Sequence, residues 1–189
     1  MDMTFNRRNF LKTTGAAAAL LPTFNILSNE ANTIGPKDDQ VNVGVIGYGA
    51  EGEILTDAAM KIPGVRFTAV CDIWEYRRKM ARGRLKSLGH TVNVYEDYRE
   101  MLSKEDKNID CCIVATPDWM HAEITNAALR AGKHVYCEKE MSNSLEKAKT
   151  MVVAQRETGK LLQIGHQRRS NPRYMHAINR VIRESKMLG

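Results

Sequence analysis

Residues 41–52 read VNVGVIGYGAEG, in which an apolar run, Val41–Ile46, leads into the pattern G-x-G-x-x-G. The run has the length of a buried strand, and apolar residues at helical spacing follow the last glycine. In that setting Gly47 permits a tight turn, Gly49 lets a pyrophosphate approach the backbone, and Gly52 lets the helix pack close to the strand. The helix N-terminus adds unpaired N–H groups for phosphates. The stretch predicts a dinucleotide-binding turn made of Gly47, Tyr48, Gly49, Ala50, Glu51 and Gly52.

Short apolar runs alternate with helical patterns along the rest of the chain. The runs expected as strands are Val41–Ile46, Val65–Cys71, Val92–Tyr95, Ile109–Ala115, His134–Cys137 and Leu161–Ile164. Between them lie expected helices such as Leu145–Thr158, with Ser144 as its N-cap and Gly159 at its end. This alternation predicts an α/β fold, a parallel sheet with helices on both faces. A glycine-rich turn in another α/β protein, such as a methyltransferase, is the alternative interpretation.

Asp72 stands twenty residues after Gly52, where the second expected strand ends. A carboxylate at this place accepts hydrogen bonds from the ribose hydroxyls of adenosine and repels a 2′-phosphate. It therefore favours NAD over NADP as the cofactor. Arg77 and Arg78 lie nearby and weaken the exclusion of NADP. The alternative is that Asp72 only caps the following helix.

Two more segments follow strands, at the sheet edge where open α/β folds bind ligands. The first is ATPDWMH, residues 115–121, in which Asp118 could equally cap a helix and His121 is expected at a helix surface or cap. The second is Glu138-Lys139-Glu140. A lysine at the nicotinamide end of the crevice can bind a substrate hydroxyl and help to move its proton. A solvated lysine is the alternative.

Taken together, four segments resemble the Gfo/Idh/MocA family of sugar and cyclitol oxidoreductases over residues 41–189. They are VGVIGYG (43–49), ATP…H (115–121), Glu138-Lys139 and GHQRRSNP (165–172). The resemblance implies a Rossmann-like domain in which Lys139 acts on the substrate hydroxyl beside the nicotinamide and Arg168 lies close to the cofactor. The cofactor-binding residues then expected beyond the glycine pattern and Asp72 are Thr116, Pro117, His121, Glu138, Lys139 and Arg168.

The sequence departs from the family pattern at Glu140, where the family has a proline after the lysine. A proline adopts a cis peptide bond far more easily than other residues. If the family backbone needs cis there, Lys139 could sit differently in this chain. Glu140 also places a second carboxylate beside Lys139, which favours the charged lysine.

The N-terminal residues are expected to form an export signal. A paired arginine, Arg7-Arg8, precedes Phe-Leu-Lys and a short apolar stretch, a pattern that resembles a twin-arginine signal. We expect a signal peptide over residues 1–31, a linker over 32–40, the Rossmann-like domain over 41–170 and a first helix over 171–189. That helix would lead into an α+β substrate domain that we expect to be missing. A periplasmic or other extracytoplasmic location follows; a basic, disordered N-terminus is the alternative.

Composition and charge exclude several other classes of protein. The net charge is +6, but residues 160–189 alone carry seven Lys and Arg against Glu184, so no basic stripe crosses the domain. With aromatics at 6%, nucleic-acid binding is not expected. No apolar run approaches the ~20 residues of a membrane span. Cys111 and Cys112 are adjacent, point to opposite faces of a strand and suit no shared metal, so we assign no metal site.

The sequence thus predicts an NAD(P)-dependent oxidoreductase of Gfo/Idh/MocA type. It would transfer hydride between nicotinamide and a hydroxyl of a sugar, cyclitol or glycoside, with Lys139 as the catalytic residue, and form a homo-oligomer when full length. One alternative is a glycosidase or lyase that keeps NAD tightly bound and uses it transiently. Another is a fragment that binds NAD without catalysis. We expect the 189 residues alone to bind NAD and to show no turnover.

Overall fold

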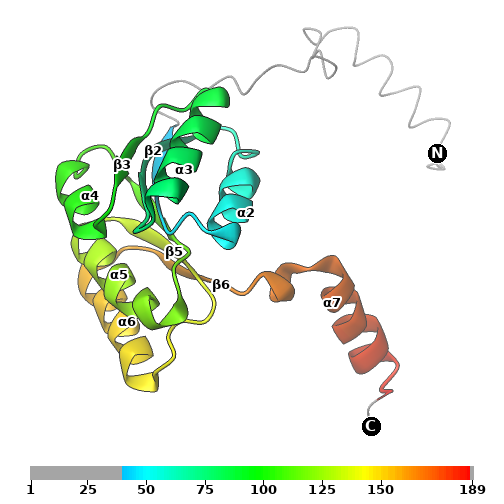
Figure 1. Cartoon of the computed structure of the whole chain (residues 1–189). Helices are drawn as coiled ribbons and strands as arrows, with labels where there is room; N and C mark the ends of the chain where they lie inside the picture. The colour runs from blue at the N-terminus through cyan, green and yellow to red at the C-terminus, as the bar shows by residue number, and fades with distance from the viewer. Residues whose placement is uncertain (1–39, 188–189) are drawn as a thin grey trace, which may run out of the picture. The chain divides into compact units, whose positions relative to one another are not determined.

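The structure is a computed structural model that describes residues 40–187. The expected signal peptide and nearly all of the expected linker lie outside the described residues. From Gln40 onward, six strands alternate with helices, as the sequence predicts (Figure 1). The strands are β1 (Val41–Ile46), β2 (Val65–Cys71), β3 (Asn93–Tyr95), β4 (Cys111–Val114), β5 (His134–Glu138) and β6 (Leu162–Gly165).

All five strand pairings are parallel, in the order β3-β2-β1-β4-β5-β6. This is the order of doubly wound dinucleotide-binding folds, so the predicted Rossmann-like sheet is confirmed. The strand order reverses between β1 and β4, because the chain continues outward from β1 in both directions. The carboxyl ends of these two strands therefore leave a crevice at the sheet edge.

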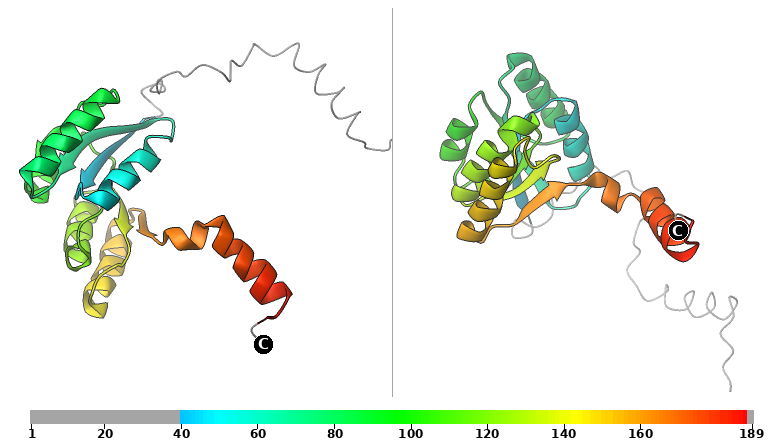
Figure 2. Two further views of the ribbon diagram at one scale, coloured as in Figure 1. Left: turned by 45° about the vertical axis from the view of Figure 1, so that its right-hand side comes forward. Right: turned by 90° about the horizontal axis from the view of Figure 1, so that it is seen from below.

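Five helices cover the sheet: α2 (Ala50–Ala59), α3 (Glu75–Ser87), α4 (Tyr98–Lys104), α5 (Asp118–Arg130) and α6 (Leu145–Thr158). Beyond β6 follow the 3₁₀ helix η2 (Gln167–Ser170), α7 (Pro172–His176) and the π-helical segment η3 (Ala177–Glu184). Figure 2 shows α2 on one side of the sheet and α5 and α6 on the other. Helix α6 has the predicted bounds: Ser144 accepts a hydrogen bond from the Lys147 N–H, and Gly159 ends the helix with a φ of +64°.

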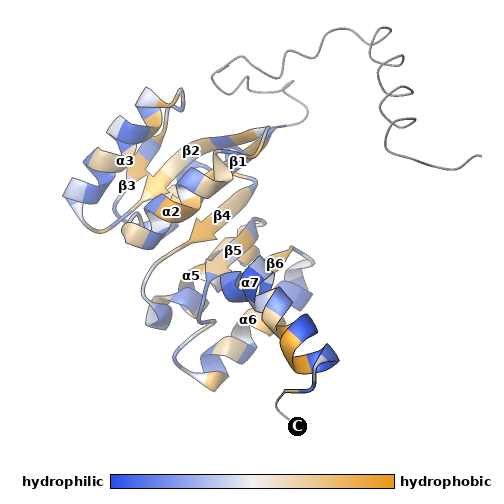
Figure 3. Ribbon diagram, turned by 90° about the vertical axis from the view of Figure 1, so that its right-hand side faces the viewer, coloured by the Kyte–Doolittle hydropathy of each residue, from blue (hydrophilic) through white to orange (hydrophobic). Residues whose placement is uncertain are grey.

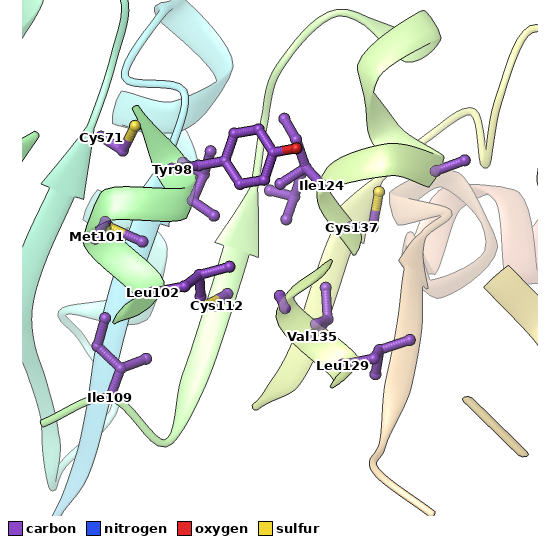
Figure 4. Packing of buried hydrophobic residues seen from close by; sticks show 14 of the residues in the cluster. Cys71, Tyr98, Met101, Leu102, Ile109, Cys112, Ile124, Leu129, Val135 and Cys137 are labelled. Atoms are coloured by element: carbon purple, nitrogen blue, oxygen red, sulfur yellow. The ribbon is translucent and has the colours of Figure 1, made fainter. Parts of the chain in front are cut away.

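The core consists of two layers of buried side chains, one on each face of the sheet. One layer joins β1 and β2 to α3 through residues such as Phe67 and Leu85, and the other packs α4, α5 and α6 on β4 and β5. Figure 3 shows the apolar strands between helices with polar outer faces. Figure 4 shows the second layer, in which Cys71, Tyr98 and Ile124 lie at the end nearest the strands' carboxyl ends. That end borders the crevice.

Candidate functional site

A cavity of about 580 Å³ opens at the carboxyl ends of β1, β2 and β4. Its size falls within the range of small-molecule pockets, roughly 300–1,000 Å³. The cavity is lined by Ile46, Gly47, Gly49, Cys71, Asp72, Ile73, Trp74, Arg77, Glu96, Tyr98, Ala115, Thr116, Pro117, Trp119, Met120 and Ile124. Five of the residues predicted from the sequence to bind the cofactor thus share one cavity: Gly47, Gly49, Asp72, Thr116 and Pro117.

The glycine turn, residues 47–52, is shaped by close backbone approaches. Gly47 has a φ of +91°, and a Cβ there would lie 2.6 Å from the carbonyl oxygen of Ala115 on the neighbouring strand end. A Cβ on Gly52 would overlap the carbonyl oxygen of Gly47, so the helix can approach the strand only with glycine at this position. A Cβ on Gly49 would meet nothing within 4 Å. The turn therefore exposes backbone at Gly49 toward the cavity, as a bound pyrophosphate requires.

Tyr48, although it stands between two glycines of the motif, turns its side chain away from the cavity. The ring is fully buried in the core layer that contains Phe67 and Leu85. Its hydroxyl has no hydrogen-bond partner among the described residues, and burial raises the pKa of the phenol. Only its backbone serves the site, because the Tyr48 N–H donates to Asp72 over 2.8 Å. Neighbouring Ala50 and Glu51 form the first turn of α2 and do not line the cavity.

Asp72 holds the β2 edge of the cavity through both carboxylate oxygens. Oδ2 accepts the Tyr48 N–H and Oδ1 accepts the Trp74 N–H, each over 2.8 Å. Each oxygen keeps a further lone pair for a ligand hydroxyl, because a carboxylate has about four acceptor sites. The bond to the Trp74 N–H resembles a cap, but Trp74 itself is the N-cap of α3. Asp72 thus couples the glycine turn to the start of α3 from within the cavity wall.

The two arginines after Asp72 are both paired with carboxylates. Arg77 lies 3.4 Å from Glu53, and Arg78 lies 3.0 Å from Glu96. Arg78 also donates to the backbone carbonyl of Asp72 over 2.7 Å. The β2 side of the cavity therefore carries two carboxylates, those of Asp72 and Glu96, and its arginines are engaged with acidic partners.

Two exposed tryptophans on the cavity wall were not assigned from the sequence. Trp74 is 59% exposed and Trp119 is 54% exposed, although large aromatic side chains are usually largely buried. The guanidinium of Arg77 lies 5.9 Å from the centre of the Trp74 ring. The sequence did contain a signal for both as cavity residues, since each tryptophan stands within a few residues of the end of an expected strand. Apolar residues at such positions are candidates for stacking on a flat ligand.

Thr116 and Pro117 carry the chain from β4 into α5 along the cavity. The Thr116 hydroxyl is buried and has no hydrogen-bond partner among the described residues. A buried hydroxyl without a partner costs free energy, unless a ligand supplies the bond. This orphaned hydroxyl and the open space at Gly49 both fit a polar cofactor in the cavity. Pro117 is the N-cap residue of α5, and Asp118 lies in the first turn of that helix, not at the cap.

The lysine turn, residues 138–140, follows β5. Glu138 is buried, accepts a hydrogen bond from the Tyr136 hydroxyl over 3.1 Å and another from the Lys139 N–H over 3.1 Å. Burial, together with the nearby Glu138 carboxylate, raises the pKa of Tyr136 to about 12. The Lys139 side chain is exposed, and the Lys139–Glu140 peptide bond is cis although no proline is present. A Cβ on Gly165 would overlap the Glu138 carboxylate, so β6 leaves room for it.

The expectation of a surface or capping histidine at position 121 is wrong. His121 is only 1% exposed, because α5 already begins at Asp118 and His121 lies on the buried face of that helix with Ala122 and Thr125. Its Nδ1 lies 2.5 Å from the Glu140 carbonyl oxygen and its Nε2 lies 2.7 Å from the Thr116 carbonyl oxygen. The side chain therefore joins the two loops and does not line the cavity.

The structure does not bring all predicted site residues into the cavity wall. Glu138, Lys139 and Arg168 lie outside the lining. Arg168 belongs to η2, where its guanidinium donates to the Tyr174 hydroxyl over 2.9 Å. Cys71 lines the cavity, but burial raises the pKa of its thiol to about 12, so it is not a thiolate nucleophile near neutral pH. Among residues 40–187 there is no cluster of three side chains suited to hold a metal.

Comparison with known proteins places this geometry in a family. Residues 41–166 match the model of the Gfo/Idh/MocA oxidoreductase family, described as an NAD-binding Rossmann fold. Residues 4–21 match the signal sequence of the twin-arginine translocation pathway. That match agrees with the predicted export signal, which lies outside the described residues.

Within residues 40–187, every helix is too short or too polar to cross a membrane.

Individual relatives are similar to the chain over part of their length. An inositol 2-dehydrogenase of Salmonella paratyphi B is 30% identical over 74% of this chain and 40% of its own length. Glycosyl hydrolase family 109 protein 2 of Shewanella sp. is 30% identical over 75% of this chain and 35% of its own length. The chain thus spans well under half the length of these curated relatives.

A solved structure agrees with the fold as well. The scyllo-inositol dehydrogenase of Lactobacillus casei, with bound NAD(H) and scyllo-inositol, superposes with a TM-score of 0.67 at 28% identity. The match covers 77% of this chain and 42% of that one. The strand order, the glycine turn at the crevice and the family match over most of the described residues lead to one assignment. The chain belongs to the Gfo/Idh/MocA family of oxidoreductases with an NAD-binding Rossmann fold.

Proposed function

We propose that the cavity binds NAD and that the protein uses it to transfer hydride to and from a hydroxyl-bearing carbon of a cyclitol or sugar. The observation that carries the proposal is the glycine turn. Gly49 presents bare backbone to the cavity at the N-terminus of α2, where the pyrophosphate would lie. The partnerless Thr116 hydroxyl on the same wall supports a polar ligand there.

The adenosine half of the cofactor would occupy the β2 side of the cavity. The free lone pairs of Asp72 would accept the ribose hydroxyls, and Trp74 and Trp119 offer flat apolar surfaces for the adenine. A 2′-phosphate would meet the carboxylates of Asp72 and Glu96, while Arg77 and Arg78 are already paired. These charges support a preference for NAD over NADP.

The nicotinamide half would point toward the lysine turn. When bound, NAD supplies a carbon that accepts a hydride from the substrate. The substrate hydroxyl would give its proton to the Lys139 amino group as its carbon loses the hydride, leaving a carbonyl. Glu138 would hold the backbone of the turn through the Lys139 N–H. A proton-transfer group of this kind contributes about 10²–10⁴-fold to a rate.

The inositol dehydrogenases among the relatives support a cyclitol or sugar as the substrate. The twin-arginine signal supports a periplasmic site of action, since this pathway exports across the cytoplasmic membrane. Exposed apolar side chains on α7 and η3 support the expectation of a homo-oligomer. These side chains are Tyr174, Met175, Ile178, Val181 and Ile182.

A second candidate is redox-neutral cleavage of a glycoside, which the similarity to glycosyl hydrolase family 109 proteins favours. In this reaction the carbon that bears a sugar hydroxyl would lose a hydride to bound NAD, the aglycone would leave by elimination, water would add in its place, and the hydride would return to the sugar. The bound cofactor would end the cycle unchanged. The two candidates therefore differ in the net formation of NADH.

The test uses protein immunopurified from its own cells with antibodies against residues 41–187, alongside the purified 189-residue chain. Both are supplied with NAD and panels of cyclitols, sugars and aryl glycosides. We expect net NADH from the cellular protein with a cyclitol or sugar. Aglycone release without net NADH would favour the second candidate. NAD binding by the cellular protein without either product would contradict both candidates.

For the purified chain alone we expect NAD binding without turnover. Enzymatic rate enhancements usually reach at least ~10⁶-fold. Lys139 supplies only part of that factor, and the rest requires groups that hold the substrate over the nicotinamide. The residues assigned above provide the cofactor contacts and one proton-transfer group.

A further inference from the structure

His121 makes hydrogen bonds that a neutral histidine cannot make together. Its Nδ1 and Nε2 lie 2.5 Å and 2.7 Å from two backbone carbonyl oxygens, those of Glu140 and Thr116. A carbonyl oxygen only accepts hydrogen bonds, and a neutral imidazole carries one N–H. The second nitrogen would then direct its lone pair at an oxygen. Only the imidazolium, with an N–H on both nitrogens, satisfies both contacts.

Two other histidines of the chain, the buried His90 and the partly exposed His134, show the opposite arrangement. His90 is 4% exposed, and its Nδ1 accepts a hydrogen bond from the Phe67 N–H over 3.2 Å. A ring nitrogen that accepts carries no proton, so the His90 ring is neutral, and burial lowers its pKa. The Nδ1 of His134 likewise accepts from the Leu161 N–H over 3.0 Å. His121 is therefore distinguished from both by the chemistry of its partners.

The two carbonyls belong to the two loops on which the proposed reaction depends. Thr116 lines the cavity at the end of β4, and Glu140 directly follows Lys139 at the end of β5. The ring thus joins the cofactor loop, residues 115–117 after β4, to the lysine turn. A shift of either carbonyl would move a residue that the proposed function assigns to the cofactor or to the proton.

The elements next to His121, which are β4, β5, α5 and α6, carry the following titratable groups. Strand β5 and its turn contribute the buried carboxylate of Glu138 and the exposed side chains of Lys139 and Glu140. Helix α5 itself carries Asp118 and Glu123; the latter accepts a hydrogen bond from Tyr98 of α4. Helix α6 adds the exposed side chains of Glu146, Lys147 and Lys149, and β4 the thiols of Cys111 and Cys112. Among these groups Glu138 is the buried carboxyl group, on the strand that leads into the turn contacted by His121.

We propose that His121 is a positioning residue: its imidazolium donates to both carbonyls and fixes the lysine turn against the cofactor loop. The consequence for catalysis rests on the proposed function, since it matters only if Lys139 handles the substrate proton. The charge state and the bridge themselves do not depend on that role. They can therefore be tested separately.

The first experiment is nitrogen NMR of the histidine rings in the 189-residue chain labelled with ¹⁵N-histidine at pH 7.5. The ring signals are assigned in the parent protein, so no variant has to fold. We expect both His121 nitrogens to be protonated, whereas His90 in the same spectrum shows one protonated and one bare nitrogen. A bare nitrogen at His121 would overturn the proposal, whether or not the chain binds NAD.

The second experiment compares two variants, His121→Gln and His90→Gln, for stability and for NAD affinity. Glutamine can donate to one of the two carbonyls but presents an oxygen to the other. We expect His121→Gln to weaken NAD binding about tenfold, because the cofactor loop loses its bond to the ring. We expect His90→Gln to change NAD affinity less than about twofold. Backbone amide signals of residues 116 and 140 should shift together only in His121→Gln.

Equal losses of affinity in the two variants, at equal losses of stability, would reduce His121 to a structural role and contradict positioning. If His121→Gln does not fold, the amide signals of residues 116 and 140 are followed in the parent as temperature rises. They should move together, because one ring contacts both carbonyl groups. Independent movement of the two signals would contradict the proposed bridge. If the parent binds no NAD, the proposed function fails while the NMR result on the ring stands.

Discussion

The glycine turn and the lysine turn lie at the same edge of the sheet but are built in opposite ways. The glycine turn is made of backbone: Gly52 lies against the Gly47 carbonyl, and Gly49 leaves open space. The lysine turn is held by side chains, through the Glu138 carboxylate and the His121 ring. A backbone obstacle cannot move aside, whereas a side chain can change rotamer. Added bulk at Gly47 or Gly52 should therefore be costly to the fold, whereas substitutions around the lysine turn should have smaller, graded effects.

The largest effect is expected for Gly52→Ala. The new Cβ would overlap the Gly47 carbonyl oxygen, so the turn or α2 must move. We expect a loss of about 3 kcal/mol of unfolding free energy, the upper range for overpacking a tight site. Chemical denaturation measures it. The matched control is Gly83→Ala in α3, where a Cβ meets nothing within 4 Å and should stabilise the helix by roughly 0.5–1 kcal/mol. Equal stability of the two variants would contradict a backbone-built turn.

Gly49→Val should separate binding from folding. Its side chain would enter open space at the cavity, so the fold should lose no more than about 1 kcal/mol, the scale of an altered N-cap. NAD affinity should fall between about tenfold and a hundredfold, because the side chain occupies the place of the pyrophosphate. Isothermal calorimetry measures the affinity. Unchanged binding by a folded Gly49→Val chain would place the cofactor elsewhere.

Gly165→Ala probes the lysine turn in the same manner. Here the obstacle is the ends of two side chains, those of Glu138 and Tyr136, and not backbone. We expect a smaller loss of about 1–2 kcal/mol, because these groups can shift. The Lys139 amide signal should move, since Glu138 accepts its N–H, while NAD affinity changes little. A loss as large as that of Gly52→Ala would show that both turns are equally rigid.

The smallest effect is expected for the cofactor preference in Asp72→Ser. Removing the carboxylate removes the repulsion of a 2′-phosphate, but Glu96 remains on the same wall. The ratio of NAD to NADP affinity should fall about fivefold, which corresponds to roughly 1 kcal/mol. Competition titrations with both cofactors give the ratio. An unchanged ratio would mean that Asp72 only ties the Tyr48 and Trp74 N–H groups.

The strands and the glycine turn were predictable because their signals are local. Apolar runs and the spacing of Gly47, Gly49 and Gly52 depend on neighbours in the chain. The environment of His121 was not predictable in this way, because Thr116 and Glu140 meet only through the pairing of β4 with β5. The inward turn of Tyr48 likewise depends on its packing in the core layer of Phe67 and Leu85. Side-chain direction at a turn is decided by such distant partners.

The central claim, that the cavity holds NAD, can be tested directly through the two tryptophans of the sequence. Both Trp74 and Trp119 line the cavity, so bound NADH would lie within range of energy transfer. Excitation of tryptophan in the purified chain should produce nicotinamide emission that saturates with NADH and is weaker with NADPH at the same concentration. In Gly49→Val the same emission should need about tenfold to a hundredfold more NADH. Unaltered tryptophan emission at high NADH, in a chain shown to be folded by circular dichroism, would contradict the account.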